Sequence, residues 1–158
     1  MEIRKIQARD FDEWFKLEEQ YTKYNNKVER VKALRYKVSK NGRKKWFLKR
    51  LKKRDKLFLV LAEGNKLQGY FYGLIEKING NGYYYKTSRI GYIGNVFISR
   101  KYRGKGYFSC FLKEFFNFLK RRRVKYCILH VDIGNKPAID AYQKSKFLIT
   151  EYKMVCKV

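Results

Sequence analysis

Acidic residues are scarce in this chain. Over 158 residues, 14 Asp and Glu stand against 39 Lys and Arg, which gives a formal net charge of +25. A charge of this size attracts nucleic acid, an anionic cofactor, an acidic protein surface or anionic lipid, with a strong dependence on salt. The alternative, that most of the positive charge only forms a solvated surface, stays open from the sequence.

Cysteine, proline and long apolar runs are scarce as well. The chain has one proline and three cysteines, and the odd number of cysteines without Cys-x-x-Cys spacing argues against a disulfide framework or a zinc site. Cys110, Cys127 and Cys156 each lie in an apolar periodic segment, so we expect them to be buried. No apolar run approaches the roughly 18 residues of a membrane span, and the N-terminus lacks an apolar signal segment. We therefore expect a cytoplasmic protein without a metal ion or a membrane partner.

The residues that are present favour a globular fold. Hydrophobic residues make up 45% of the chain and aromatic residues 18%, which is enough for a sizeable core, and no linker or repeat divides the sequence. We therefore expect one domain over residues 1–158. Apolar periodicity predicts strands at 2–8, in the two arms of a hairpin at 56–78, at 89–99, at 126–131 and once or twice within 147–158. It predicts helices at 11–24, 43–54, 108–119 and 135–145.

Local signals support several of these elements. Asp10 followed by Glu13 has the pattern of a capping box, and Asn135 before Pro137 is typical of an N-cap. Two glycines lie inside the strand at 89–99, which often marks a bulge or the close approach of a ligand. The order of strands and helices predicts an α/β or α+β fold around a mixed sheet.

Residues 99–112, "SRKYRGKGYFSCFL", form a glycine-rich loop between a predicted strand and a predicted helix. In this setting the backbone amides of Gly104 to Phe108 lie at the helix N-terminus, where amides and helix dipole bind phosphate or pyrophosphate. Basic side chains add charge around the loop, at Lys101, Arg103 and Lys105. The loop is not a P-loop, because GxxxxGK[ST] is absent. It is not a dinucleotide fingerprint either, because Ser109 stands where a third glycine is needed.

Two segments resemble the signatures of one family. Residues 103–108, "RGKGYF", follow a predicted strand and are similar to the signature Gln/Arg-x-x-Gly-x-Gly/Ala. Residues 135–147, "NKPAIDAYQKSKF", are similar to a second signature, Asn-x-x-Ala-x-x-x-Tyr-x-x-x-Gly-Phe. Together they resemble the GNAT superfamily of acyl-CoA-dependent N-acetyltransferases, with a motif layout closest to the ribosomal-protein N-terminal acetyltransferases. The resemblance covers nearly the whole chain. It implies a mixed, mostly antiparallel sheet of six or seven strands flanked by about four helices.

The chain departs from these signatures at two positions. Phe108 replaces the small last residue of the first signature, so its ring either narrows the pyrophosphate pocket or turns into the core. Lys146 replaces the glycine before Phe147, where a left-handed residue is usual.

The resemblance implies acetyl-CoA as the acyl donor. Backbone groups of Val96, Phe97 and Ile98 would pair with pantetheine and help to polarise the thioester carbonyl. The loop residues that it implies for cofactor binding are Arg103, Gly104, Lys105, Gly106, Tyr107, Phe108 and Ser109. Asn135 would contact pantetheine or cap its own helix.

The resemblance also suggests the catalytic groups. Tyr142 aligns with the usual general acid, which protonates the CoA thiolate, although a tyrosine here could equally serve packing. Many relatives place a basic carboxylate where this chain has Tyr92. Others place the base five residues before the Asn, and that position is His130, the single histidine. Imidazole titrates near neutrality and suits a base. A structural role for His130, with water relayed by backbone carbonyls as the base, remains an alternative.

The amine acceptor would lie against the first two helices. Residues 25–56 there carry fifteen Lys and Arg against two acids, Glu29 and Asp55. Our hypothesis is an acceptor that is anionic or bound to nucleic acid, whereas a polycation is disfavoured. The amine could belong to a protein N-terminus, a lysine or a small molecule.

Another class of function stays open. The chain could be a basic nucleic-acid-binding module that uses residues 27–56, with Tyr36, Trp46 and Phe47 stacked on bases. It could also be a degenerate member that binds CoA without transfer. Both a monomer and a homodimer fit the sequence.

Overall fold

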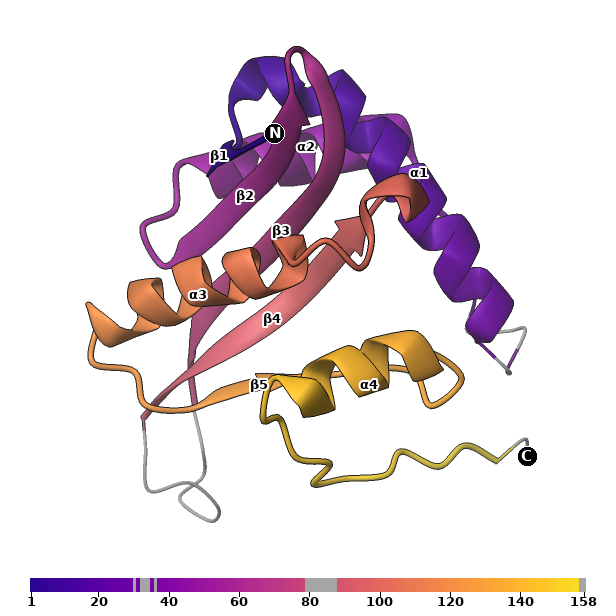
Figure 1. Ribbon diagram of the computed structural model, residues 1–158, viewed down its shortest axis with the longest axis vertical. Helices are drawn as coiled ribbons and strands as arrows, with labels where there is room; N and C mark the ends of the chain where they lie inside the picture. Colours follow the sequence, from indigo (N-terminus) through magenta and orange to yellow (C-terminus); the bar gives the residue numbers. More distant parts are fainter. Residues whose placement is uncertain (30, 32–34, 36, 79–87, 157–158) are drawn as a thin grey trace.

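The fold is built on a mixed sheet. The computed structural model describes residues 1–29, 31, 35, 37–78 and 88–156. Within these, a five-stranded sheet has the order β1-β2-β3-β4-β5 (Figure 1). Its strands are β1 (Glu2–Lys5), β2 (Lys56–Glu63), β3 (Lys66–Lys77), β4 (Arg89–Ile98) and β5 (Cys127–Leu129). The first four are antiparallel neighbours, and β5 runs parallel to β4.

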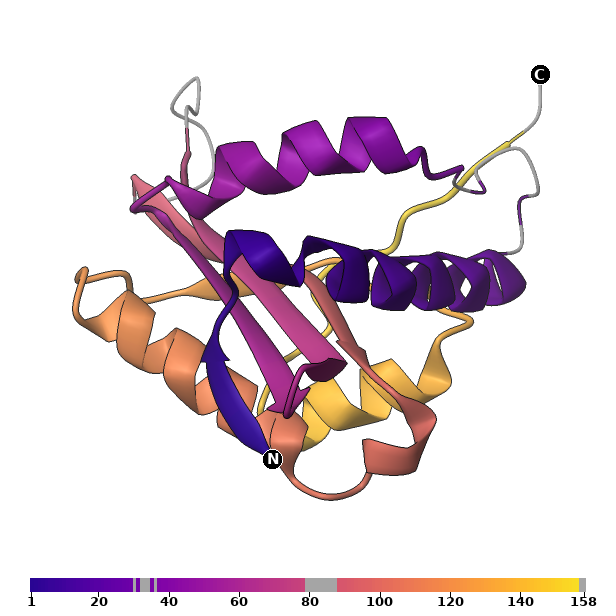
Figure 2. The same ribbon diagram turned by 90° about the horizontal axis from the view of Figure 1, so that it is seen from above.

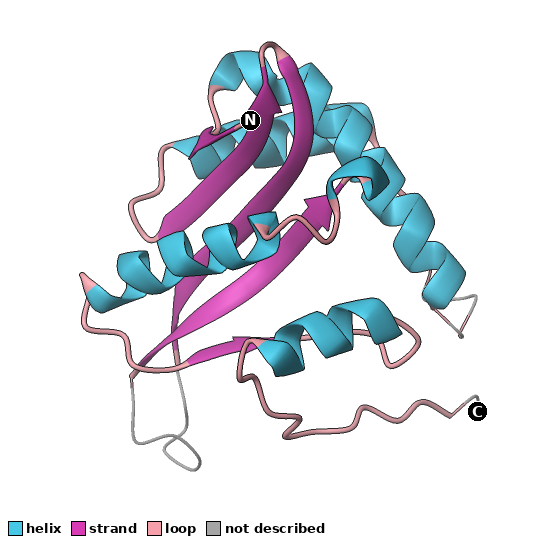
Figure 3. Cartoon of the chain, in the orientation of Figure 1, coloured by secondary structure: helices cyan, strands magenta, loops and turns pink. Residues whose placement is uncertain are grey.

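Helices cover both faces of the sheet. Seen from above, two helices lie on one face and two on the other (Figure 2). The first face carries α1 (Phe11–Val28) and α2 (Lys40–Leu51), and the second carries α3 (Tyr107–Lys120) and α4 (Lys136–Lys144). Short 3-10 turns, η1 (Ala8–Asp10) and η3 (Arg100–Tyr102), follow β1 and β4 (Figure 3). None of the helices among the described residues is long and apolar enough to cross a membrane.

Strand alternation sorts the aromatic residues into two cores. In β3, Tyr70 and Tyr72 face α1 and α2, whereas Phe71 between them faces α3. Trp14 of α1 and Phe47 of α2 meet in the first core, with ring centroids 5.0 Å apart. Since these side chains are almost fully buried, each contributes roughly 2–3 kcal/mol of hydrophobic free energy to folding.

Two strand glycines let α3 approach the sheet closely. A Cβ atom at Gly73 would lie 2.6 Å from Cε2 of Phe115, and one at Gly91 would lie 2.6 Å from Cδ1 of Leu119. Both distances are far below van der Waals contact, so a larger residue would push α3 away from β3 and β4. This close packing positions the N-terminus of α3 beside the end of β4.

A buried carboxylate joins both helices of the first face to the sheet. Glu18 of α1 is fully buried and forms an ion pair with Arg43 of α2. The Tyr70 phenol donates a hydrogen bond to Oε2 of Glu18 at 2.5 Å, and the Asn95 side chain of β4 hydrogen-bonds the same phenol. This network, Arg43–Glu18–Tyr70–Asn95, runs from α2 through α1 and β3 to β4.

The sheet and its helices confirm the predicted fold class, but the strand count was wrong. The described sheet has five strands rather than six or seven. Residues 148–156, expected to form closing strands, make no strand, and their large apolar side chains are exposed. Because no strand from residues 148–156 pairs with it, β5 is an edge strand of three residues and is only partly buried. The sequence had predicted a longer, buried strand at 126–131.

The predicted capping box is also wrong. Asp10 occupies the N-cap position of α1, but its side chain does not cap the helix. Its carboxylate instead accepts hydrogen bonds from the Gln7 amide at 2.7 Å and from the Arg4 guanidinium at 2.7 and 2.9 Å. These contacts hold the pKa of Asp10 below its usual value, with the Arg4 hydrogen bond as the main cause.

The prediction that all three cysteines are buried is also wrong. Cys110 and Cys156 are exposed, and Cys127 is half-buried.

The departure at Lys146 has a clear structural consequence. Lys146 adopts a left-handed φ of 68°, and it closes a Schellman motif in which the Phe147 amide donates to the Tyr142 carbonyl at 3.1 Å. A lysine in this conformation carries a strain of about 1 kcal/mol that glycine avoids.

We therefore expect Lys146→Gly to raise the free energy of unfolding by about 0.5–1 kcal/mol, after allowance for the more flexible unfolded chain. Chemical denaturation measures this change. Lys144→Gly, inside the same helix, is the control and should lower stability by about 1 kcal/mol. Equal destabilisation by both substitutions would refute the assignment of strain to Lys146.

The buried network gives a second expectation. Glu18→Ala leaves the half-buried Arg43 without its counter-ion and the buried Tyr70 hydroxyl without its carboxylate acceptor, so the free energy of unfolding should fall by about 3–5 kcal/mol. Glu19→Ala removes an exposed carboxylate one residue along and should change stability by less than about 0.5 kcal/mol. Similar values for the two variants in urea unfolding would show that the network contributes little.

Candidate active site

The site begins where β4 separates from β5. The two strands form three residue pairs. The first is Gly91 with Cys127 and the last is Ile93 with Leu129, and no pairing follows. The next residue of β4 is Gly94, the extra residue of a bulge against β3, where Tyr72 pairs with Asn95 and Gly73 with Ile93. Beyond it, β4 continues without a described strand on this side, and the two strands visibly diverge (Figure 1). The bulge predicted from the strand glycines is therefore confirmed at Gly94.

The predicted pantetheine residues lie on this divergent part of β4. Val96 and Ile98 turn their side chains toward α3, and Phe97 turns toward α1. A backbone edge without a neighbouring strand has hydrogen-bonding groups that a ligand can use. The geometry of β4 therefore fits an extended polar chain such as pantetheine.

The glycine loop that follows has the conformation of an anion site. Gly104 and Gly106 have left-handed φ values of 73° and 80°, and a Cβ atom on either would meet nothing within 4 Å. Gly106 is the N-cap residue of α3, and no side chain caps this end of the helix. The first amides of α3 therefore face open space at the positive end of the helix dipole. This loop fits the pyrophosphate of coenzyme A.

The basic side chains of the loop point in different directions. The Nζ atoms of Lys101 and Lys105 lie 5.8 and 5.4 Å from the centre of the Tyr102 ring. Arg103 instead turns toward α1, since its Nε donates to the Ile98 carbonyl at 2.9 Å and its guanidinium lies 5.5 Å from the Tyr24 ring.

The structure decides between the two alternatives for Phe108. Its ring packs edge-on against Tyr142 with centroids 5.3 Å apart, and it belongs to the apolar cluster of the second face. Phe108 therefore turns into the contact between α3 and α4 and leaves the loop amides open.

Tyr142 lies close to groups from three other elements. Burial raises the pKa of its phenol, with smaller contributions from Tyr21 of α1, Cys127 of β5 and Tyr92 of β4. Tyr21 packs in the cluster on the α1 side of the sheet and Tyr142 in the cluster on the α3 side, so this contribution acts across the sheet. Because its pKa is raised, Tyr142 stays protonated at neutral pH, which is the form that a general acid requires.

His130 directly follows β5 and is exposed. Its Nδ1 lies 3.1 Å from the Tyr92 hydroxyl of β4, and the two ring centroids are 5.6 Å apart. Cys127 and Leu129 face α3, so alternation places His130 on the α1 side of the sheet. Tyr92 therefore touches His130 and also influences Tyr142, a link that sequence reasoning missed.

Asn135 is the N-cap of α4, as predicted. Its Oδ1 accepts hydrogen bonds from the Ala138 amide at 3.4 Å and from the Tyr24 hydroxyl at 3.1 Å. The capping alternative is thus confirmed. The second bond joins α1 to the start of α4 across the open end of the site.

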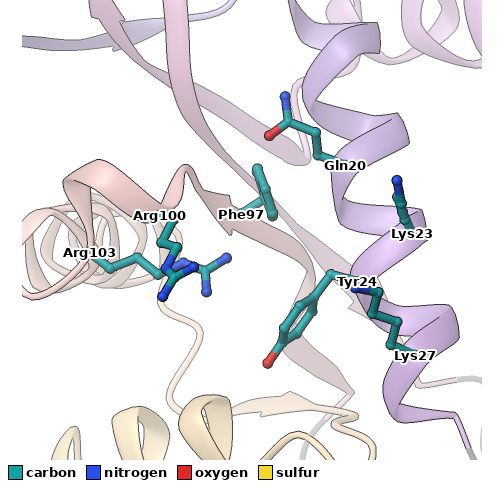
Figure 4. Close-up of a pocket in the computed structure, with 7 residues that line it drawn as sticks. All are labelled: Gln20, Lys23, Tyr24, Lys27, Phe97, Arg100 and Arg103. Carbon is teal, nitrogen blue, oxygen red and sulfur yellow. The ribbon is translucent and has the colours of Figure 1, made fainter.

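A cleft of about 390 Å³ lies between α1 and the loop after β4 (Figure 4). Its lining residues are Gln20, Lys23, Tyr24, Lys27, Phe97, Arg100 and Arg103. Sequence reasoning named Phe97 and Arg103 of these individually and included Lys27 only in the basic segment 27–56, because the contribution of α1 depends on how that helix crosses the sheet.

Comparison with known proteins identifies the family. A family model described as acetyltransferase (GNAT) family matches residues 3–147. The chain belongs to the GNAT family. It is an acetyl-CoA-dependent N-acetyltransferase, and the loop and divergent strand fit that donor.

Solved structures show the same fold. The apo aminoglycoside 6'-N-acetyltransferase of Acinetobacter haemolyticus has a TM-score of 0.78 at 13% identity, covering 100% of this chain and 98% of that one. A predicted acetyltransferase from Clostridium acetobutylicum, solved with acetyl-CoA, has a TM-score of 0.76 at 18% identity over 99% and 95%. A tetramutant of the BH1408 protein of Bacillus halodurans reaches 0.81 at 17% identity over the full length of both chains.

The loop conformation leads to a test of donor binding. Gly106→Ala forces a side chain into a left-handed backbone at the N-cap, so the loop should rearrange and the Kd for acetyl-CoA should rise at least about tenfold. Gly64→Ala is a matched control, because Gly64 has a φ of 56° and equally open space in the distant β2–β3 turn. Isothermal titration measures both variants. Unchanged binding by Gly106→Ala would exclude these amides as the pyrophosphate site.

Proposed function

We propose that this GNAT enzyme acetylates a primary amine by direct attack on acetyl-CoA in a ternary complex, with Tyr142 as the general acid and His130 as the general base. The observation that carries the proposal is the position of both side chains at the divergence of β4 and β5, next to the strand edge that fits pantetheine. Amine acetylation is also what the printed names of the aminoglycoside N-acetyltransferase neighbours describe.

His130 has a partner that can set its tautomer. When Nδ1–H donates to the Tyr92 oxygen, the lone pair of Nε2 is free to accept a proton from the attacking amine. The amine nitrogen of the acceptor then forms a bond to the carbonyl carbon of the acetyl group. The bond between that carbon and the sulfur of coenzyme A breaks. Tyr142 donates its proton to the departing sulfur. Backbone groups of Val96 to Ile98 hold the thioester arm, and the amides of Gly104 to Ser109 hold the pyrophosphate.

Tyr142→Phe tests the acid. We expect kcat to fall about 10²–10⁴-fold, because the sulfur must then leave without a proton donor. The Kd for acetyl-CoA should stay unchanged, since the phenyl ring keeps its packing against Phe108. Tyr126→Phe is the control, because Tyr126 is 65% exposed beside β5. Full activity of Tyr142→Phe would remove the proposed acid.

His130→Gln extends the same measurement to the base. The variant should lower kcat about 10²–10⁴-fold, because the amide side chain cannot accept the proton of the attacking amine. Full kcat in His130→Gln would show that His130 is not the base.

The basic segment favours an acceptor without multiple positive charges. α2 contains no acidic residue, and Lys45, Lys49 and Lys52 are exposed along one stripe of the helix and the residue after it. Together with the net charge of +25, this field repels polycationic acceptors such as aminoglycosides and attracts anionic ones.

The aromatic residues of α2 do not support a nucleic-acid-binding module. Phe47 is fully buried, and Trp46 stacks on Trp14 with centroids 5.8 Å apart and Arg50 3.9 Å above its ring. These rings are occupied by the core, so they are not free to stack on bases. Tyr36, the third predicted residue, lies outside the described residues. The basic face of α2 remains a surface for an anionic or nucleic-acid-bound acceptor.

A further inference from the structure

The cleft between α1 and the loop after β4 is strongly cationic. Four of its seven lining residues are basic and none is acidic. Lys23 and Lys27 stand one turn apart on α1, whereas Arg100 and Arg103 come from η3 and the residue that follows it. In the close-up, both guanidinium groups point into the space between the loop and α1 (Figure 4).

None of these four cations forms an ion pair with an acidic residue in the part of the chain that the structure describes. The ion pairs formed within the described part of the chain involve Arg4, Lys16, Lys40 and Arg43. Like charges gathered in a concave site repel each other, and low-dielectric walls strengthen that repulsion. An anion in the cleft would remove the repulsion and would be attracted by all four groups.

The cleft also has fixed walls. Arg103 is held by the Ile98 carbonyl and lies 5.5 Å from the Tyr24 ring and 5.8 Å from the Phe97 ring. Tyr24 is itself fixed by its hydrogen bond to Asn135. The guanidinium is therefore held in place, which reduces the entropy lost when it binds a ligand.

The cleft lies next to the reaction site on the α1 side of the sheet. Phe97, which lines the cleft, packs against Tyr21 with centroids 6.4 Å apart. Tyr21 precedes Tyr24 by one helical turn and is among the groups that act on Tyr142. Phe97 itself lies on the part of β4 beyond its last pair with β5, so the cleft borders the divergent strand directly.

We propose that this cleft binds a carboxylate or phosphate group of the amine acceptor, so that the enzyme selects amines that also carry an anion. The inference rests on the proposed function. An anion of the same chemistry is also present on the donor, as the 3'-phosphate of coenzyme A, and the experiment separates the two sources. We assign the cleft to the acceptor because it lies on the α1 side of the sheet, whereas α3, whose first amides fit the pyrophosphate, lies on the other side (Figure 2).

A series of ω-amino acids and their amides provides the probes. Each pair differs only in the anion, and the number of methylenes varies its distance from the amine. For the wild-type enzyme we expect kcat/KM for the acid to exceed that for its amide at least about tenfold at the best chain length, worth about 1.4 kcal/mol. The preference should weaken with added salt. Equal kcat/KM for acids and amides at every length would overturn the proposal.

Arg100→Gln tests whether the cleft causes this preference. The acid should lose most of its advantage through KM, while kcat/KM for the amide should change less than about twofold. Lys113→Gln, which removes one exposed charge from the outer face of α3, should preserve the preference. A similar loss in both variants would assign the preference to net charge and overturn the role of the cleft.

Titration of the enzyme with acetyl-CoA and with 3'-dephospho-acetyl-CoA shows whether the cleft binds the 3'-phosphate of the donor or an anion of the acceptor. If Arg100→Gln weakens binding of acetyl-CoA but not of the dephospho form, the cleft holds the donor phosphate and the proposal is wrong. Equal Kd values for wild type and variant support the acceptor assignment.

Titration of the best ω-amino acid into the CoA-bound enzyme needs no turnover. Binding that Arg100→Gln weakens would support the cleft even if Tyr142 and His130 proved dispensable. Failure of the catalytic proposal and failure of this one are therefore distinguishable.

Discussion

The bulge at Gly94 is the constraint on which the rest of this structure depends. One extra residue shifts the β3–β4 register exactly where the pairing between β4 and β5 stops after three residue pairs. A Cβ atom at Gly94 would lie 2.9 Å from Cδ1 of Tyr72, so the tight fit against β3 requires glycine. The divergence that results frees one edge of β4 and lets Tyr142, from one face, approach groups on the other.

The surroundings of the bulge are rigid on both sides. On the α1 side, Asn95 is held by Tyr70, whose phenol bonds the buried Glu18 and through it Arg43. On the α3 side, Phe115 and Leu119 pack directly against the backbone of β3 and β4, because Gly73 and Gly91 have no side chains. An apolar pair of similar volume could often replace a buried ion pair without loss of stability, so we interpret the role of Glu18 as joining α1, α2 and β4 in one arrangement. The elements that face the acceptor are thereby connected to the strand that faces the donor.

Much of the fold could be predicted from the sequence, since strong periodicity fixed the helices and the long strands. The glycine loop, the Asn135 cap and the bulge were also predicted, because each depends on a local residue pattern. The failures were elsewhere. Asp10 has the sequence of a cap but is engaged by Arg4, a residue of another element, and residues 148–156 have a strand-like pattern without strand pairing. At Asp10 a neighbouring strand residue took the carboxylate that the local pattern assigned to the helix, and at 148–156 the local pattern found no strand to pair with.

The sequence by itself determined the loop chemistry, the positions of the glycines and the sign of the charge, because these follow from residue types a few positions apart. Only the tertiary structure decided where the side chains meet. It turned Phe108 into the core and brought Tyr92 into contact with His130. It also placed Lys23 and Lys27 of α1 in one cleft with Arg100 and Arg103. The reason is geometric: α1 and the end of β4 lie about 70 residues apart in the chain, and only the sheet on which both are mounted brings their charges into one cleft.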